Sequence, residues 1–111
     1  MEVNPFPGPH TFVSIPNAVT AFIVGYNGER IKRLHQLTGA YIFVPKDFNT
    51  LTDERILQLS GNDKSVEFCA KEIKQIVTVM APLLEIDLSA FNRKRRGIRS
   101  KFERLLNTQL E

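Results

Sequence analysis

The chain reads Gly25-Tyr26-Asn27-Gly28-Glu29-Arg30-Ile31-Lys32-Arg33-Leu34 at the stretch that decides its fold. Two glycines enclose a two-residue turn, and an amphipathic segment follows the turn directly. Glycine adopts positive φ without strain and has no Cβ, so another backbone can approach such a turn closely. The first N–H groups of the following helix have no partner inside the helix and favour anions. The stretch therefore predicts a turn that can receive a sugar-phosphate backbone.

The segments on either side of this turn predict a small α+β domain. Proline ends two short apolar runs of strand type, and Gly39 is placed to end the helix that leaves the turn. The expected elements are a strand over residues 11–15, helices over 17–24 and 28–38, strands over 40–44 and 55–59, and a helix from about 63 to Pro82. Asn17 is expected to cap the first helix, and the turn over residues 60–63 to cap the last. The strands should form an antiparallel sheet with three helices on one face.

Three pieces of this pattern together resemble the type I K-homology (KH) domain. They are Val13-Ser14-Ile15-Pro16, the string from Ile23 to Lys32, and Thr38-Gly39-Ala40-Tyr41-Ile42. The resemblance covers residues 12–79 and implies a β-α-α-β-β-α fold with a three-stranded antiparallel sheet. We therefore expect a proline-rich lead-in over residues 1–10, a KH domain over 11–82 and a C-terminal extension over 83–111.

The resemblance implies a non-catalytic module that binds single-stranded RNA, with single-stranded DNA as an alternative ligand. KH domains hold about four unpaired nucleotides beside the G-x-x-G turn. Such a module is expected in a post-transcriptional regulator. Matched to the family, the nucleic-acid-binding residues are Ala21, Phe22, Val24, Gly25, Tyr26, Asn27, Gly28, Ile31, His35, Val44 and Arg55.

The sequence departs from the KH pattern at the turn and just before it. The family often has Lys or Arg inside the turn, where this chain has Tyr26 and Asn27, and usually has Gly where Ala21 stands. Phe22 stands where a small residue is common, so the two side chains either crowd the groove or add stacking area. An alternative interpretation follows, in which the fold serves protein–protein interaction or dimerisation and binds nucleic acid weakly. Outside the resemblance, Arg55 is as well explained by a surface ion pair, and His35 by a solvated position on its helix.

The positive charge of the chain lies in its C-terminal extension. Residues 1–84 carry eight Lys or Arg and eight Asp or Glu, whereas residues 85–111 carry seven and four. A basic amphipathic helix is predicted from about Arg93, with Ile98, Phe102 and Leu105 on its apolar stripe. The candidate auxiliary phosphate contacts are Arg93, Lys94, Arg95 and Arg96. The alternatives are packing on the domain, a homodimer or protein partner through the stripe, and nuclear import.

Composition argues against several other classes of protein. No apolar run approaches the length of a membrane span, so no membrane association is expected. No secretory leader is recognised, and a single cysteine cannot form an internal disulfide. We therefore expect a cytoplasmic protein, with the nucleus as an alternative. Two histidines and Cys69 show neither catalytic nor metal-ligand spacing, so no catalysis, cofactor or metal is predicted, and Cys69 is expected to be a packing residue.

Overall fold

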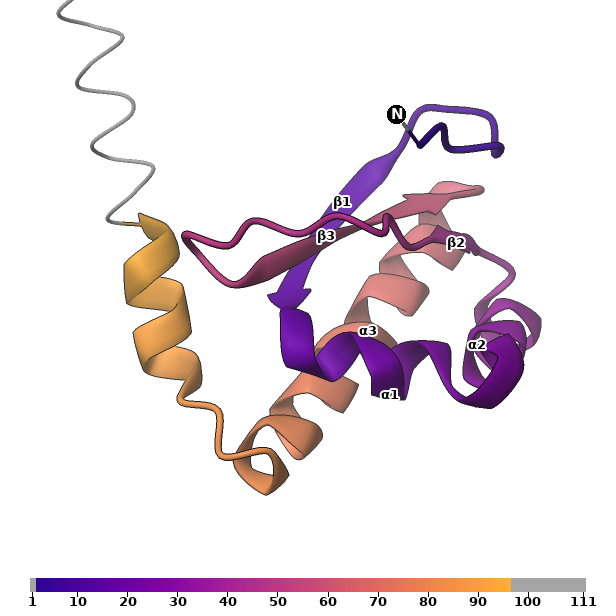
Figure 1. The fold of residues 1–111 in the computed structure, drawn as a ribbon. Helices are drawn as coiled ribbons and strands as arrows, with labels where there is room; N and C mark the ends of the chain where they lie inside the picture. The colour runs from indigo at the N-terminus through magenta and orange to yellow at the C-terminus, as the bar shows by residue number, and fades with distance from the viewer. Residues whose placement is uncertain (1, 97–111) are drawn as a thin grey trace, which may run out of the picture.

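A computed structural model describes residues 2–96 (Figure 1). Its elements are, in order, β1 (Thr11–Pro16), a 3-10 turn (Asn17–Val19), α1 (Thr20–Val24), a 3-10 turn (Tyr26–Gly28), α2 (Glu29–Thr38), β2 (Tyr41–Phe43), β3 (Glu54–Ser60) and α3 (Asp63–Leu83). A further helical segment covers residues 88–96. The order confirms the β-α-α-β-β-α arrangement and the α+β class expected from the sequence.

The three strands form one antiparallel sheet in the order β1-β3-β2. Val13 lies opposite Leu57, and Tyr41 lies opposite Ser60. The helices α1, α2 and α3 all lie on one side of the sheet (Figure 1). Because β3 is central, β1 and β2 each leave one edge without a neighbouring strand.

Alternation along the strands and helical spacing build the core between the sheet and the helices. Residues 13 and 15 of β1 and 57 and 59 of β3 face the helices, as the period of a strand requires. The buried cluster comprises Val13, Ile15, Val19, Ile23, Leu34, Ala40, Ile42, Leu57, Leu59, Val66, Cys69 and Ile73. The expectation that Cys69 is a packing residue is confirmed, since its side chain is fully buried.

The predicted cap of the first helix is wrong. Pro16, not Asn17, occupies the position before the first helical turn, and it makes no side-chain cap. The backbone N–H of Asn17 donates instead to the carbonyl of Asp53 at 2.9 Å. Its side-chain oxygen accepts from Arg55 Nε at 3.0 Å, so Asn17 joins the end of β1 to the start of β3.

The other helix ends match the sequence closely. Gly39 follows α2 with φ of 80°, in the left-handed region that favours glycine. The side chain of Asn62 accepts a hydrogen bond from the backbone N–H of Ser65 at 2.8 Å, which confirms a cap in the turn before α3. Pro82 lies inside the last turn of α3, which ends one residue later at Leu83.

Both flanks of the expected domain pack on it. In the lead-in, the ring of Phe6 stacks on Tyr41 of β2 with centroids 4.8 Å apart, and Asn4 Nδ2 donates to Gln58 Oε1 at 2.9 Å. At the other end, Phe91 of the segment 88–96 is buried. The predicted apolar stripe over Ile98, Phe102 and Leu105 lies outside the described residues.

Candidate functional site

The turn between α1 and α2 has the backbone that its glycines predict. Gly25 has φ of 74°, Asn27 has φ of 54° and Gly28 has φ of 74°. Asparagine tolerates this left-handed region better than most residues. The side chain of Tyr26 is 83% exposed, and Asn27 is also exposed. The turn therefore presents its two middle residues to solvent, while its two glycines are partly buried.

The two glycines are required for different reasons. A Cβ on Gly25 would lie 2.7 Å from Arg30 Cγ and 2.9 Å from the Arg30 backbone nitrogen. A Cβ on Gly28 would meet nothing within 4 Å, so only its positive φ favours glycine there. Gly25 is thus needed for the fold of the turn, whereas Gly28 leaves open space at the start of α2.

The turn lies at one end of a strip between α2 and the free edge of β2. Ile31 on α2 and Val44 just after β2 are both partly buried and pack against the core. Val24, at the end of α1, is partly buried as well. The domain buries part of each of these apolar side chains, and the remaining exposed surface is available to a ligand. Within residues 2–96, the main-chain groups on the outer edge of β2 have no neighbouring strand.

His35 joins α2 to β2 at the far end of this strip. Its ring packs on Tyr41 with centroids 4.5 Å apart, and Nδ1 lies 2.8 Å from the carbonyl oxygen of Ala40. A carbonyl only accepts hydrogen bonds, so Nδ1 carries the proton and Nε2 remains the second polar atom of the ring. His35 is thus half buried and held in place, which does not match a freely solvated histidine.

Arg55 holds the β2–β3 connection instead of forming a surface ion pair. Its Nη1 donates to the carbonyl of Pro45 at 3.0 Å, and its Nε donates to Asn17. The guanidinium also lies over the ring of Phe48, 5.5 Å from the centroid. No ion pair of Arg55 is found within residues 2–96, so that alternative is not supported there. Its contact with a base stays a prediction.

Phe22 is partly buried and contacts Arg30. Arg30 Nη1 donates to the carbonyl of Phe22 at 3.3 Å, and the guanidinium lies 5.8 Å from the centre of the phenylalanine ring. The Arg30 side chain also lies next to Gly25. A contact between Phe22 and a base stays a prediction. Ala21 is exposed, so its methyl group is not enclosed by the domain.

Lys32 is a candidate that the sequence reasoning missed. It is exposed and follows Gly28 by four residues and precedes His35 by three, so the three residues lie on one side of α2. It is the cation that the turn itself lacks. The spacing of four residues between Gly28 and Lys32 was the sequence signal that could have identified this candidate.

The lead-in reaches the same edge of the domain and was also missed. Glu2 Oε2 accepts a hydrogen bond from the backbone N–H of Lys46 at 2.6 Å, just beyond β2. His10 Nε2 lies 2.8 Å from the Phe6 carbonyl, which closes the lead-in on itself. Contacts between residues distant in sequence, such as that of Phe6 with Tyr41, identify this segment as part of the surface.

The basic extension divides into one packed and three exposed side chains. Arg95 Nε lies 3.4 Å from Glu54 Oε2, and the guanidinium lies 5.1 Å from the ring centroid of Phe91. Arg93, Lys94 and Arg96 are exposed. Packing on the domain thus engages Arg95, while phosphate contact by the other three stays a prediction.

Residues 2–96 show neither a metal site nor a membrane span. No group of three or more histidine, cysteine, aspartate or glutamate side chains there could hold a metal ion. No helix in that range is both long and apolar enough to cross a membrane.

Comparison with known proteins agrees with the geometry. The sequence model of the family described as "KH domain" matches residues 10–75. The chain is 37% identical over 71 residues to mouse Tudor and KH domain-containing protein, which covers 64% of this chain and 12% of that protein. It is 35% identical over 63 residues to human far upstream element-binding protein 1, which covers 57% of this chain and 10% of that protein. The chain thus spans about a tenth of the length of these relatives.

Proposed function

Because the chain belongs to the KH domain family, matched over residues 10–75, we propose that it is a non-catalytic module that binds about four nucleotides of single-stranded RNA. The family binds single-stranded nucleic acids. We place this nucleic acid along the strip between α2 and the β2 edge. The phosphates lie at the turn and the bases lie toward β2.

The exposed turn over residues 25–28 is the observation that carries this proposal. Both glycines have positive φ, Tyr26 and Asn27 are exposed, and the first N–H groups of α2 lie beside the turn. These features favour a phosphate group at the turn even though its two middle residues carry no charge. Lys32, one helical turn further along α2, supplies a cation at the same side.

Base contacts follow from the apolar and polar groups beyond the turn. Val24, Ile31 and Val44 offer half-exposed apolar surface on which bases can lie. His35 Nε2 and the main chain of the β2 edge offer polar atoms to base edges. The ring of Tyr26 is free to stack on a base, an interaction worth roughly 1–3 kcal/mol in single-strand binders. Stacking at Tyr26 therefore offsets part of the missing charge.

A nuclear magnetic resonance titration with short oligonucleotides tests this proposal. Randomised tetranucleotide pools of RNA and of DNA are added to the full chain, and amide shifts are mapped along the sequence. We expect the largest shifts over residues 24–32 and 41–46, with RNA bound at least as tightly as DNA. Amides of the exposed face of α3, such as those of Lys64 and Lys71, serve as the internal control. Shifts confined to other surfaces, or absent at millimolar RNA, would refute the assignment.

The wider role is proposed from the same site. A single module that contacts about four bases binds RNA weakly, so physiological affinity needs neighbouring modules or a second copy of this one. We propose that the protein acts in post-transcriptional regulation in the cytoplasm, with the nucleus as the alternative compartment. Imaging of the tagged protein, in its parent form and as the Tyr26→Asp/Asn27→Asp variant, identifies the compartment.

A further inference from the structure

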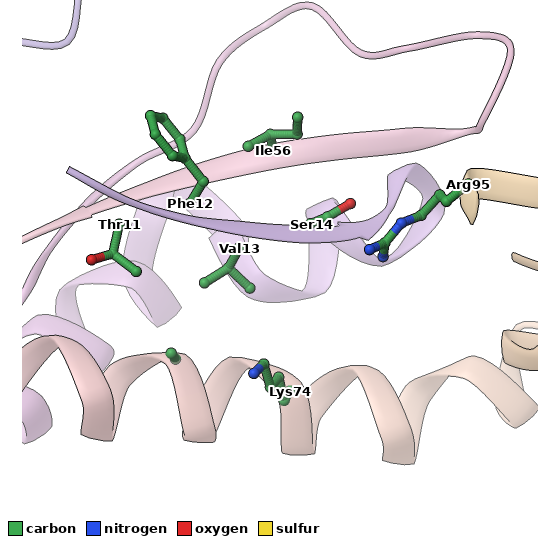
Figure 2. A pocket seen from close by; sticks show the side chains of 8 residues that line it. Thr11, Phe12, Val13, Ser14, Ile56, Lys74 and Arg95 are labelled. Atoms are coloured by element: carbon green, nitrogen blue, oxygen red, sulfur yellow. The ribbon is translucent and has the colours of Figure 1, made fainter. Parts of the chain in front are cut away.

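The free edge of β1 borders a groove that nucleic-acid binding does not use. The groove has a volume of about 470 Å³ and lies between β1 and α3. It is lined by Thr11–Ser14 of β1, Ile56 of β3, Ala70 and Lys74 of α3, and Arg95 (Figure 2). Its volume is within the usual range of ligand sites, roughly 300–1,000 Å³.

The main chain of β1 is the first element of recognition in this groove. In an edge strand, every second residue directs its N–H and C=O away from the sheet, and these groups pair readily with another extended chain. The segment 88–96 covers the far end of β1, where Phe91 and Asn92 lie beside Pro16. The open length of edge is therefore Thr11–Ser14, enough for a short added strand.

The charges in the groove give the second element of recognition. Lys74 and Arg95 are its charged lining residues, and both are cations. In Figure 2, Lys74 lies on α3 below β1, and Arg95 reaches in from the segment 88–96. Glu54 lies within ion-pair distance of Arg95 but is not among the lining residues. Within residues 2–96, the groove thus combines the main chain of an edge strand with Lys74 and with Arg95, which also contacts Glu54.

We propose that this groove binds an extended peptide segment with acidic side chains, which adds as a strand beside Thr11–Ser14. Strand addition satisfies both the N–H and the C=O groups of the edge, and acidic side chains match Lys74 and Arg95. The alternating apolar surface of Phe12 and Ile56, 64% and 37% exposed, receives side chains from one face of the added strand.

Other occupants fit the groove less well. A second copy of the chain would bring another Lys74 and Arg95 to the same place, and like charges repel. Residues 97–111 carry three Lys or Arg and two Glu, so their net charge is of the wrong sign. A phosphate backbone accepts hydrogen bonds but offers few donors to the carbonyls of the edge. An acidic peptide satisfies all of these groups.

The peptide site is independent of the proposed nucleic-acid site because the two lie at opposite edges of the sheet. The sheet order β1-β3-β2 places one central strand between them. Both ligands can therefore bind at once. A failure of RNA binding leaves this inference untouched, and a failure of peptide binding leaves the proposed function untouched.

The test is a resonance titration of the full chain with three eight-residue synthetic peptides. The first alternates valine with glutamate, the second alternates valine with lysine, and the third is the first with alternate amides N-methylated. We expect the glutamate peptide to shift the amides of Thr11–Ser14 and of Ala70. The other two peptides should leave these amides unchanged at the same millimolar concentration.

A pair of matched variants on α3 tests the charge. Lys74→Glu should weaken the glutamate peptide about fivefold or more, since reversing an exposed charge acts twice. Lys71→Glu makes the same change of net charge on a part of α3 that borders a different hollow, with Glu67 and Phe68. It should change the affinity less than twofold, and both variants should bind RNA equally.

Several results would overturn the inference. The first is that the glutamate peptide does not shift the amides of Thr11–Ser14. The second is that the lysine peptide binds as tightly as the glutamate peptide. The third is that both α3 variants weaken binding of the glutamate peptide equally. A dimer by sedimentation whose contacts include Thr11–Ser14 assigns the edge to a second copy instead. Contacts between Thr11–Ser14 and residues 97–111 in the free chain assign it to the tail, and shifts of these amides by RNA assign it to nucleic acid.

Discussion

Replacing Tyr26 and Asn27 together by aspartate should weaken RNA binding while the domain stays folded. Tyr26 is 83% exposed and Asn27 is exposed, so neither substitution empties a core position. Asn27 has φ of 54°, and aspartate tolerates this conformation about as well as asparagine does. The free energy of unfolding should therefore change by about 0.5 kcal/mol or less.

The cost to binding can be worked out from Coulomb's law. Two carboxylates about 6 Å from one phosphate cost roughly 1.4 kcal/mol at a dielectric constant of 80 and about 5.5 kcal/mol at 20. Salt at about 0.15 M, with a Debye length of about 8 Å, removes roughly half of this. The remaining 0.7–2.8 kcal/mol, by the same estimate, weakens binding about threefold to a hundredfold. Loss of stacking by Tyr26 adds to this.

The assay is fluorescence anisotropy with a labelled tetranucleotide RNA pool, and circular dichroism monitors the fold. Ser89→Asp/Ala90→Asp is the matched control, because it adds the same two charges at exposed positions of the segment 88–96. This segment lies on the opposite side of the domain from α2 (Figure 1). The control should bind normally. If the folded turn variant binds within twofold of the parent, or if the control is weakened as much, the phosphate position at the turn is wrong.

Four further predictions concern stability, reactivity and salt dependence. Gly25→Ala should lower the free energy of unfolding by about 2 kcal/mol or more, because its Cβ would lie 2.9 Å from the Arg30 backbone nitrogen. Gly28→Ala should lower it by about 1 kcal/mol, because only the positive φ opposes alanine there. A urea titration that ranks the two variants the other way would contradict the turn geometry. Burial raises the pKa of the Cys69 thiol above 9.0, so Cys69 should resist iodoacetamide in the native state, and deprotonation in the unfolded chain should lower stability as the pH rises above about 9; alkylation as fast as in urea would refute this. Arg95→Ala should lower the free energy of unfolding by about 1–3 kcal/mol, because the Glu54 carboxylate beside it is buried. Arg96→Ala, at an exposed position, should lower it by less than about 0.5 kcal/mol. Equal melting temperatures of the two variants would count against the packing of the extension on the domain. Replacing Arg93, Lys94 and Arg96 by serine should flatten the plot of log affinity against log salt for a long RNA by about 0.7 for each phosphate that these side chains neutralise, and an unchanged slope would remove them from the interface.

Local signals in the sequence predicted the order of the elements and the turn. Gly25, Gly28 and Gly39 have positive φ where the sequence placed turns and a helix stop, and Pro16 ends β1. These signals act through the backbone of one or two residues, so they can be read without knowing the neighbours. The same holds for the cap at Asn62.

Pairings between distant residues could not be predicted in this way. Asn17 looked like a helix cap, but Arg55, 38 residues away, takes its side-chain oxygen. The contact of Phe22 with Arg30, eight residues further along the chain, was not predicted either. The role of the lead-in depends on Tyr41, which only the folded sheet brings to Phe6. In each case tertiary contact, not local preference, decides the partner.

The contact between Glu2 and the Lys46 amide has a practical consequence for how the protein is handled. A purification tag or a fluorophore joined ahead of Glu2 begins within a residue of the edge where we place the RNA bases. An acidic tag there would compete with the ligand, and a basic tag would strengthen binding artificially. Affinities measured with amino-terminal tags should therefore be compared with those of the cleaved protein before they are taken as properties of the domain.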